Sequence, residues 1–518
     1  MRFLQFMIVS FAVFTTALFG SCTSKEGSGE EPESPTTTSY KVRVKVSTGE
    51  YTRAGDDAAV NTLHLAFYNG EECLGIVEAT KDNDAYVCEI PAEYGKPDGV
   101  IAFANLPAGD LPTKDNVMTK TYSNFGNGDN MIMSSARYFD ASGNDKLKTP
   151  LSTMNLIEGG DVVNIKLDRI AAKVTVKSAE NAKFDTFKLS YGAYGTKDFE
   201  FNILSWVVTA VEKNGYLIKS FGDNTFSLLN TELEGWTNWN VKDNFVSHWA
   251  HSVSWNNSTD NYPKGHTLTG DYSLDYPVLN NISNNIGSSI YYHETTRPKD
   301  VYTTDNAVAS LVIIGKYGCS ELPNDVTFYH YDSDIYTSDD LIKLFLDKQK
   351  FLYDSNGKLI TRLTPSVIDN FELAMQGNGI PDNLVTLQLK ETASLSGQFR
   401  DKDGNQYLDK NIINNALAVE LGYAEMYKDG KCYFIVPIRN NTVGDPAYVT
   451  GSYGLVRNHH YNITINSISG LGTGIASEDC VPLKYTYSGQ SSSVYKVNAN
   501  VSVNEWHDVN QIVDIPKN

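Results

Sequence analysis

Charged side chains are scarce in this sequence, at 20% of its 518 residues, whereas aromatic side chains reach 11% and include 31 Tyr. This composition is typical of an extracellular β-protein, in which aromatic and β-branched residues line half-buried strands. The formal net charge is −19, and such an acidic surface argues against nucleic acid and anionic membranes as partners. A chain of this length also exceeds one ordinary core, so at least two domains are expected.

The short motifs of common enzymes are missing. The sequence has no nucleophile elbow, phosphate loop, zinc-protease helix or thioredoxin-type cysteine pair, so no catalytic residue, cofactor or metal ligand is assigned. His248 and His251 would suit a metal on a helix, but their Asn, Ser and Trp neighbours favour a packed loop. Residues 401–409 resemble a calcium loop, but the glycine stands fourth instead of sixth, which favours a tight turn. A glycosidase carboxylate pair stays open, because such residues meet only in space.

The chain begins with consecutive processing signals. Residues 1–21 form an apolar export signal that ends in small residues at Cys22, and the polar residues 23–35 read as a tether. No second apolar run approaches the roughly 20 residues of a membrane span, so attachment would rest on a lipid at Cys22. Residues 40–46 alternate with period two and predict a strand with Val42, Val44 and Val46 on one face. A flexible segment with the lone Arg53 follows.

This first strand is basic, with Lys41, Arg43 and Lys45 between its valines, while the rest of the chain is acidic. We expect the strand to be attracted to the body, weakly unless it is packed against it.

The cysteines number six, and a lipid on Cys22 would leave an odd number, which excludes a fully paired framework. Cys73 and Cys88 stand on two short apolar stretches separated by a turn-like segment. They would either form a disulfide across a hairpin or serve as two small buried hydrophobes.

Short alternating segments at 63–67, 99–104 and 161–167 predict an antiparallel sandwich, and a new strand begins at 168. Further strands are predicted at 184–189, 202–208, 384–389, 432–438 and 461–465. Residues 338–348 predict a helix with Ser338 as N-cap, and the Tyr-, Asn- and Trp-rich stretch 220–335 suggests loops. The expected fold is all-β, with two antiparallel transthyretin-like or Greek-key β-sandwich domains and a few short helices in the second.

The chain also ends on a strand of alternating pattern, after a polar, glycine-containing stretch. Val497, Ala499, Val501 and Val503 share one face of residues 494–506.

These features resemble the fimbrillins of Bacteroidales, especially the subunit type of the short fimbriae and its gut relatives, the type V pilins. The matching stretches run from one end of the chain to the other: the signal ending at Cys22, residues 52–55, 167–174, 203–208, 456–463, 468–472 and 501–506.

The resemblance implies a lipoprotein anchored in the outer membrane and then assembled into an adhesive extracellular fimbria. An arginine-specific or trypsin-like protease would cut between Arg53 and Ala54 and release the first strand, and the terminal strand of a neighbour would replace it. The donor residues would be Val497, Ala499, Val501, Val503, Trp506, Ile512, Val513 and Ile515. The partners are further copies and related accessory or tip subunits. The expected parts are the signal peptide 1–21, the propeptide 22–53, an N-terminal domain 54–167 and a C-terminal domain 168–518.

The alternative is a surface lipoprotein or pilus tip adhesin that binds glycan or protein ligands, with Trp236, Trp239, Trp249 and Trp255 as an exposed stacking platform. Such a protein has no use for a protease-sensitive first strand and a detached last one. An enzyme ranks third.

The lipid signal leads to a direct test. Replacing Cys22 with Ser removes the thiol that would carry the acyl chain, so the precursor should no longer incorporate radiolabelled palmitate. The unmodified chain is the control, and a variant that still labels would show that the signal has been misread.

Overall fold

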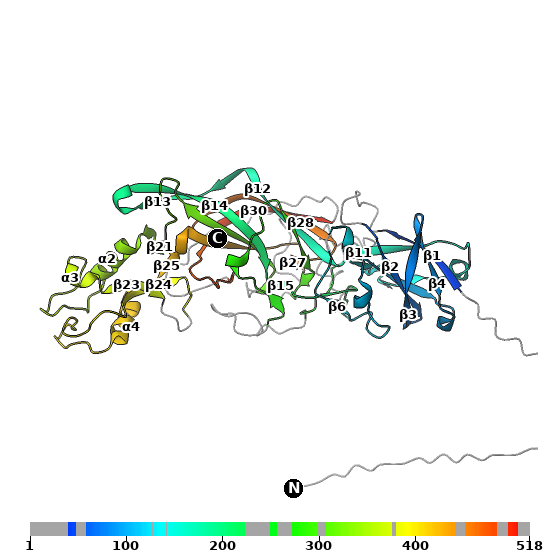
Figure 1. The fold of residues 1–518 in the computed structure, drawn as a ribbon, viewed down its shortest axis with the longest axis horizontal. Coiled ribbons are helices and arrows are strands. Elements are labelled where there is room, and N and C mark those ends of the chain that lie inside the picture. Colours follow the sequence, from blue (N-terminus) through cyan, green and yellow to red (C-terminus); the bar gives the residue numbers. More distant parts are fainter. Residues whose placement is uncertain are drawn as a thin grey trace, which may run out of the picture. The chain divides into compact units, whose positions relative to one another are not determined.

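The computed structural model describes residues 40–47, 59–126, 128–140, 142–222, 249–255, 272–298, 307–375, 380–440, 451–483 and 496–505 (Figure 1). Strands dominate its regular structure and form several sheets, which confirms the all-β class. In this part of the chain, no helix is long and apolar enough to cross a membrane.

The N-terminal sheet has the strand order β10-β5-β2-β3-β4-β1-β11-β7. Its strands are β1 (Tyr40–Ser47), β2 (Leu63–Asn69), β3 (Glu72–Asp82), β4 (Ala85–Ile90), β5 (Gly99–Ala104), β7 (Met133–Ser135), β10 (Thr149–Pro150) and β11 (Val163–Arg169). An additional pairing joins β7 to β5, so the strands from β5 round to β7 close into a ring. The ring encloses one apolar core, to which β1, β2, β4, β5 and β11 all contribute.

The next part of the chain forms a sandwich of two sheets. One sheet has the order β18-β12-β28-β30, and the other has the order β13-β14-β20-β26-β29. The strands are β12 (Ala171–Phe184), β13 (Thr186–Ser190), β14 (Thr196–Thr209), β18 (Ser289–His293), β20 (Ser310–Gly318), β26 (Lys431–Pro437), β28 (His459–Ser469), β29 (Thr473–Gly474) and β30 (Lys496–Glu505). Both sheets contribute to a shared core, with Val174 and Ile463 from one and Trp206 and Ile313 from the other.

A further five-stranded sheet, ordered β22-β21-β25-β24-β23, is covered by helices and has its own apolar core. Its elements are β21 (Phe328–Tyr331), β22 (Asp334–Tyr336), α2 (Ser338–Lys348), α3 (Pro365–Ile368), β23 (Phe371–Met375), β24 (Leu384–Leu389), α4 (Lys410–Leu421) and β25 (Ala424–Tyr427). Helix α2 packs Leu341, Phe345 and Leu346 into this core. The spacing of these residues is that of one helix face, as expected from the sequence.

Short elements complete the described fold. Two-residue strands are β6 (Thr121–Tyr122), β8 (Tyr138–Phe139), β9 (Asp145–Lys146), β15 (Val211–Glu212), β16 (Gly215–Tyr216), β17 (Leu274–Asp275), β19 (Thr295–Thr296) and β27 (Gly454–Leu455). The 3-10 helices are η1 (Ala92–Tyr94), η2 (Ala108–Asp110), η3 (Gly128–Asn130), η4 (Thr153–Leu156), η5 (Gly192–Tyr194), η8 (Leu279–Asn281) and η11 (Lys428–Gly430). The pairing of β6 with β16 is notable because it joins the N-terminal part to the chain that follows β14.

Some sequence-based expectations need correction. The N-cap of α2 is Thr337 instead of Ser338, since the Thr337 side chain accepts the Asp340 amide. Not every pairing is antiparallel, because β1 runs parallel to β11 and β12 runs parallel to β28. Within the supposed loop stretch, β20 is a fully formed strand between β14 and β26. Its continuous apolar run 311–314 is typical of a strand buried on both faces, which alternation does not reveal.

Candidate functional site

The first strand occupies a slot inside the N-terminal ring. On one side β1 pairs antiparallel with β4, from Tyr40 opposite Ile90 to Val44 opposite Tyr86. On the other side it pairs parallel with β11, from Val44 beside Val163 to Ser47 beside Lys166. Both of its backbone edges are therefore in use, as in a central strand.

The inward face of β1 is apolar, as the sequence predicted. Val42 and Val44 are fully buried in the core of the ring, and Val46 packs against it while half-buried. Filling this position removes the two valines from water, worth roughly 1.5–3 kcal/mol each. The alternation of β1 thus serves the core that the rest of the ring encloses.

The outward face of β1 is held by ion pairs. Arg43 Nη1 lies 2.6 Å from Asp82 Oδ2 at the end of β3, and Lys45 contacts Asp84 in the turn that follows. Lys41 Nζ lies 3.4 Å from Glu158 Oε1 and 3.8 Å from Glu89 Oε1. The expected attraction between the basic strand and its acidic surroundings is therefore present as side-chain contacts.

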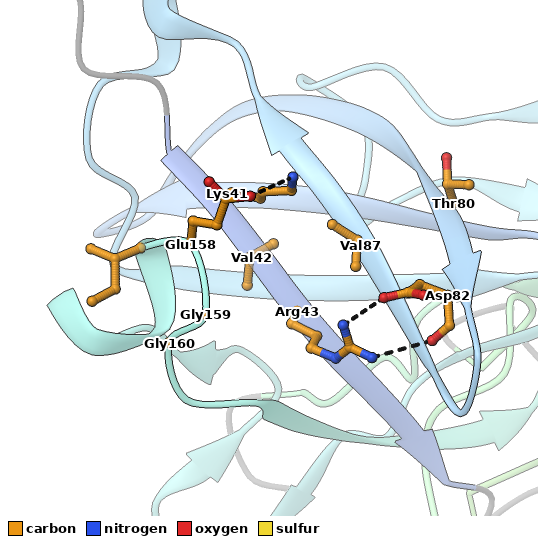
Figure 2. A pocket seen from close by; sticks show the side chains of 10 residues that line it. Lys41, Val42, Arg43, Thr80, Asp82, Val87, Glu158, Gly159 and Gly160 are labelled. Atoms are coloured by element: carbon orange, nitrogen blue, oxygen red, sulfur yellow. Dashed lines mark hydrogen bonds and ion pairs between the residues drawn. The ribbon is translucent and has the colours of Figure 1, made fainter.

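A cavity of about 450 Å³ lies along this outward face (Figure 2). Lys41 and Arg43 line it from β1, Asp82 and Val87 line it from the β3–β4 hairpin, and residues 157–160 line it from the loop after η4. The strand therefore forms one wall of this cavity, and the carboxylates of Asp82 and Glu158 line it as well.

A second cluster of polar residues is buried where β11 passes into β12. Lys219 Nζ lies 2.7 Å from Asp168 Oδ2, and both side chains are 1% exposed. Asn458 donates to the other oxygen of Asp168 at 3.3 Å and accepts from Arg169 Nη1 at 3.1 Å. Burial raises the pKa of Asp168, and the nearby Lys219 cation opposes that rise. Residues nearly 290 positions apart are therefore joined in one network.

Arg457 extends this network, with its Nε 2.9 Å from Glu294 Oε2 and both side chains 1% exposed. Its other nitrogens donate to the carbonyl oxygens of Leu217 and Tyr216. The same stretch of chain meets the N-terminal part, where Ser134 donates to the Leu217 carbonyl and Arg137 donates to the Lys219 carbonyl. The network therefore couples residues 167–174 and 456–463, two of the sequence stretches on which the family resemblance was based.

The histidines at 459 and 460 begin β28. Burial lowers the pKa of His459 to about 4, although its ring nitrogen Nδ1 lies 2.8 Å from the Arg457 carbonyl oxygen. His459 therefore stays neutral beside the buried charges at neutral pH.

The terminal strand β30 pairs antiparallel with β28 of its own chain. In this register Val503 stands opposite Tyr461, Val501 opposite Ile463 and Ala499 opposite Ile465, while Val497 stands opposite Ile468. Within the described part of the chain, β28 is its sheet partner, and β30 forms the edge of the four-stranded sheet. An edge strand is hydrogen-bonded to its sheet along one backbone side only. It can therefore leave the sheet by separating from a single neighbour, or pair with a further strand along its other side.

The alternative sites receive less support. Trp249 is fully buried, so it is not part of an exposed stacking platform. His251 stacks on Trp255 at 4.3 Å between ring centroids, as in a packed loop. The Asp401 carboxylate accepts the amides of Asp403 and Asn405, which confirms the tight turn. Among the described residues, no group of three or more His, Cys, Asp or Glu is placed to hold a metal.

Cys73 and Cys88 are both free and buried, so they serve as small apolar side chains instead of a disulfide. In the backbone register Cys73 stands opposite Tyr68 of β2, whereas Cys88 stands opposite Val42 of β1. The two cysteines therefore do not face each other across the hairpin.

The other residues assigned from the sequence lie outside the described part of the chain. They are Cys22, Arg53, Ala54, Trp236, Trp239, His248, Trp506, Ile512, Val513 and Ile515. Sequence reasoning did not identify the carboxylates that pair with β1 or the buried Lys219 and Glu294. An acidic turn next to a basic strand was a usable signal for Asp82 and Asp84, whereas nothing in the local pattern marks Lys219 or Glu294.

Residues 425–511 match the family model for the C-terminal region of fimbrillin, the major fimbrial subunit protein type IV. The match begins within β25, contains β26, β28 and β30, and includes the buried Arg457 and Asn458. The resemblance to fimbrillins is therefore confirmed in the C-terminal part of the chain.

Several solved structures are similar to this chain at low sequence identity. A fimbrillin (FimA) of Porphyromonas gingivalis W83 is 16% identical, with 91% of this chain and 98% of that chain covered and a TM-score of 0.38. A putative cell adhesion protein of Parabacteroides distasonis is 12% identical, with coverage of 90% and 99% and a TM-score of 0.35. The tip fimbrial protein Mfa3 of P. gingivalis is 10% identical, with coverage of 89% and 98% and a TM-score of 0.29. No curated protein matches the sequence.

The buried ion pair gives a stability test. Lys219→Met would leave the Asp168 carboxylate buried without its cation, so we expect a loss of roughly 3–5 kcal/mol in the free energy of unfolding. The matched control is Lys188→Met, since Lys188 pairs with Asp198 at the surface and should change stability by about 1 kcal/mol or less. Urea unfolding followed by tryptophan fluorescence measures both, and equal effects would contradict the structural role of the buried pair.

Proposed function

We propose that this protein is the structural subunit of an adhesive cell-surface fimbria, and that it polymerises by protease-triggered strand exchange. The observation that carries the proposal is the place of β1 in the ring. The first strand after the tether is a central strand, paired on both edges and filling the core, yet in the sequence it is followed directly by the segment that contains Arg53, the proposed cleavage site.

Removing β1 would have a defined physical cost. The pairing edges of β4 and β11 would lose their hydrogen-bond partners, and the space of Val42 and Val44 would open to water. A strand from another molecule, with apolar residues at alternate positions, satisfies the edges and the space together. The groove is therefore stable only while some strand occupies it.

The terminal strand is the proposed donor. Small apolar residues alternate in the terminal strand with the same spacing as the valines of β1; they are Val497, Ala499, Val501 and Val503. Further apolar residues follow them in the sequence, namely Trp506, Ile512, Val513 and Ile515. As an edge strand, β30 leaves its own sheet by separating from β28 alone within the described structure. Head-to-tail insertion of one chain into the next does not close on itself, so it generates a filament.

The remaining parts of the proposal follow the order of export. Cys22 carries the lipid that holds the precursor at the outer membrane, and a trypsin-like or arginine-specific protease cuts after Arg53. The mature chain, beginning at Ala54, then joins other copies or accessory and tip subunits in the extracellular fimbria.

Processing is tested at the arginine itself. Arg43 is held in β1 by its ion pair with Asp82, whereas Arg53 follows the strand, so the mature chain should begin at Ala54. N-terminal sequencing of filament protein measures this, and Arg53→Ala should retain β1 and abolish the filament. Arg43→Gln is the matched control and should still be cleaved after Arg53. A mature filament protein beginning at Cys22 would remove the proposed mechanism.

Deletion of residues 494–518 tests the donor. If they fill a neighbour's groove, the truncated chain should be exported, folded and cleaved but should form no filament, and Val501→Asp with Val503→Asp should do the same. Asn500→Gln with Ser502→Asn, uncharged changes on the other face of the strand, is the matched control and should still assemble.

Electron microscopy of surface extracts, and thermal unfolding of the truncated monomer beside the uncleaved precursor, give the two readouts. Nearly equal stability supports donation. If β30 instead completes its own core, the deletion should cost several kcal/mol and lower the melting temperature sharply.

A further inference from the structure

The slot that β1 occupies has an apolar core on its inward side and carboxylates on its outward side. Its outward residues Lys41, Arg43 and Lys45 all face carboxylates that belong to other elements. We call these carboxylates the acidic rim; they are Asp82, Asp84, Glu89 and Glu158. The hydrogen bond from Lys45 lowers the pKa of the Asp84 carboxyl, which favours the ionised form of that member of the rim.

The acidic rim remains when β1 leaves. Asp82 and Asp84 lie at the β3–β4 hairpin, Glu89 lies on β4, and Glu158 lies in the loop after η4. None of these elements is part of the segment removed by cleavage after Arg53. The loss of β1 would therefore withdraw the cations and leave the carboxylates without them; Figure 2 shows two of these carboxylates, Asp82 and Glu158, beside β1.

The chain's own terminal strand does not replace these cations. Its polar face carries Lys496, Asn498, Asn500 and Ser502, so one cation stands where β1 presents three. The apolar faces of the two strands are alike, since each alternates small aliphatic residues. The strands differ in charge on the outward face, which is the face that the rim surrounds.

From this mismatch we infer that the slot binds donor strands with Lys or Arg at alternate outward positions more tightly than the terminal strand of a second copy of this chain, so that a related subunit with such a strand outcompetes a further copy without excluding it. The inference rests on the proposed strand exchange. The ion pairs are partly exposed, with Lys41, Arg43 and Lys45 side chains between 36% and 43% accessible. Three such pairs together correspond to a preference of about tenfold in affinity at low salt.

The experiment uses the full chain cleaved after Arg53 and fluorescent peptides as incoming strands. One peptide has the natural sequence 494–506, and the second carries Asn498→Lys, Asn500→Arg and Ser502→Lys. A third, with Gln at the same three positions, controls for side-chain length, and a peptide of residues 40–47 controls for occupancy of the slot. Fluorescence anisotropy gives each dissociation constant at about 20 mM NaCl, where charges are weakly screened, and at about 500 mM NaCl, where they are strongly screened.

Two receiver variants separate the rim from overall charge. The rim variant is Asp82→Asn, Asp84→Asn and Glu158→Gln. The control variant is Asp198→Asn, Glu321→Gln and Asp403→Asn, whose carboxylates are in surface ion pairs elsewhere. Both variants remove the same number of charges, so a difference between them reports the position of the carboxylates.

The basic peptide should bind about tenfold more tightly than the natural and Gln peptides at low salt, and the preference should shrink at high salt. It should disappear in the rim variant and persist in the control variant. Equal affinities for natural and basic peptides on the unmodified receiver would overturn the charge selection and leave strand exchange intact. If no peptide binds, including residues 40–47, the strand exchange itself is wrong. The salt dependence on the unmodified receiver decides the question should the rim variant fail to fold.

Discussion

The backbone pairing of β1 with β4 and β11 closes the N-terminal ring of strands, and the core inside the ring depends on it. A strand at the start of a chain is usually an edge that can fray at little cost. Here it is a central strand, with Val42 and Val44 in the core. Its loss would leave the backbone edges of β4 and β11 without partners and would also open a gap in the apolar core. The position explains why a removable strand would have to be replaced.

The buried charges around Asp168 and Arg457 impose a second constraint. Two ion pairs at 1% exposure are stable only when all their partners are present, because desolvated charge without a counter-ion is costly. Their partners come from β11, from residues 216–219, from Glu294 and from the two residues just before β28. The network therefore specifies how the segment leaving the N-terminal ring enters the sandwich that carries β30. It belongs to the scaffold, and nothing about it requires catalysis.

The two faces of β1 have different physical roles. The inward valines supply burial, which is strong and undiscriminating, since any small aliphatic residue at the same period fits. The outward cations supply charge complementarity, which is weaker and more selective among strands. A donor strand that has the inward apolar residues but lacks the outward cations therefore fills the same space without the same charge complementarity.

The sequence by itself determined the features that depend on local pattern. Period-two alternation located β1, β2, β5, β11 and β24, and the spacing of apolar residues located α2. It also identified the valine face of β1 and the basic residues opposite. Alternation, however, states which side of a strand is buried and not which strand lies beside it. The closure of the ring through β5 and β7, the parallel pairing of β1 with β11, and the meeting of Asp168 with Lys219 and Asn458 were decided only by tertiary structure. These contacts join residues far apart in the chain, and their free energy depends on neighbours that no local window contains.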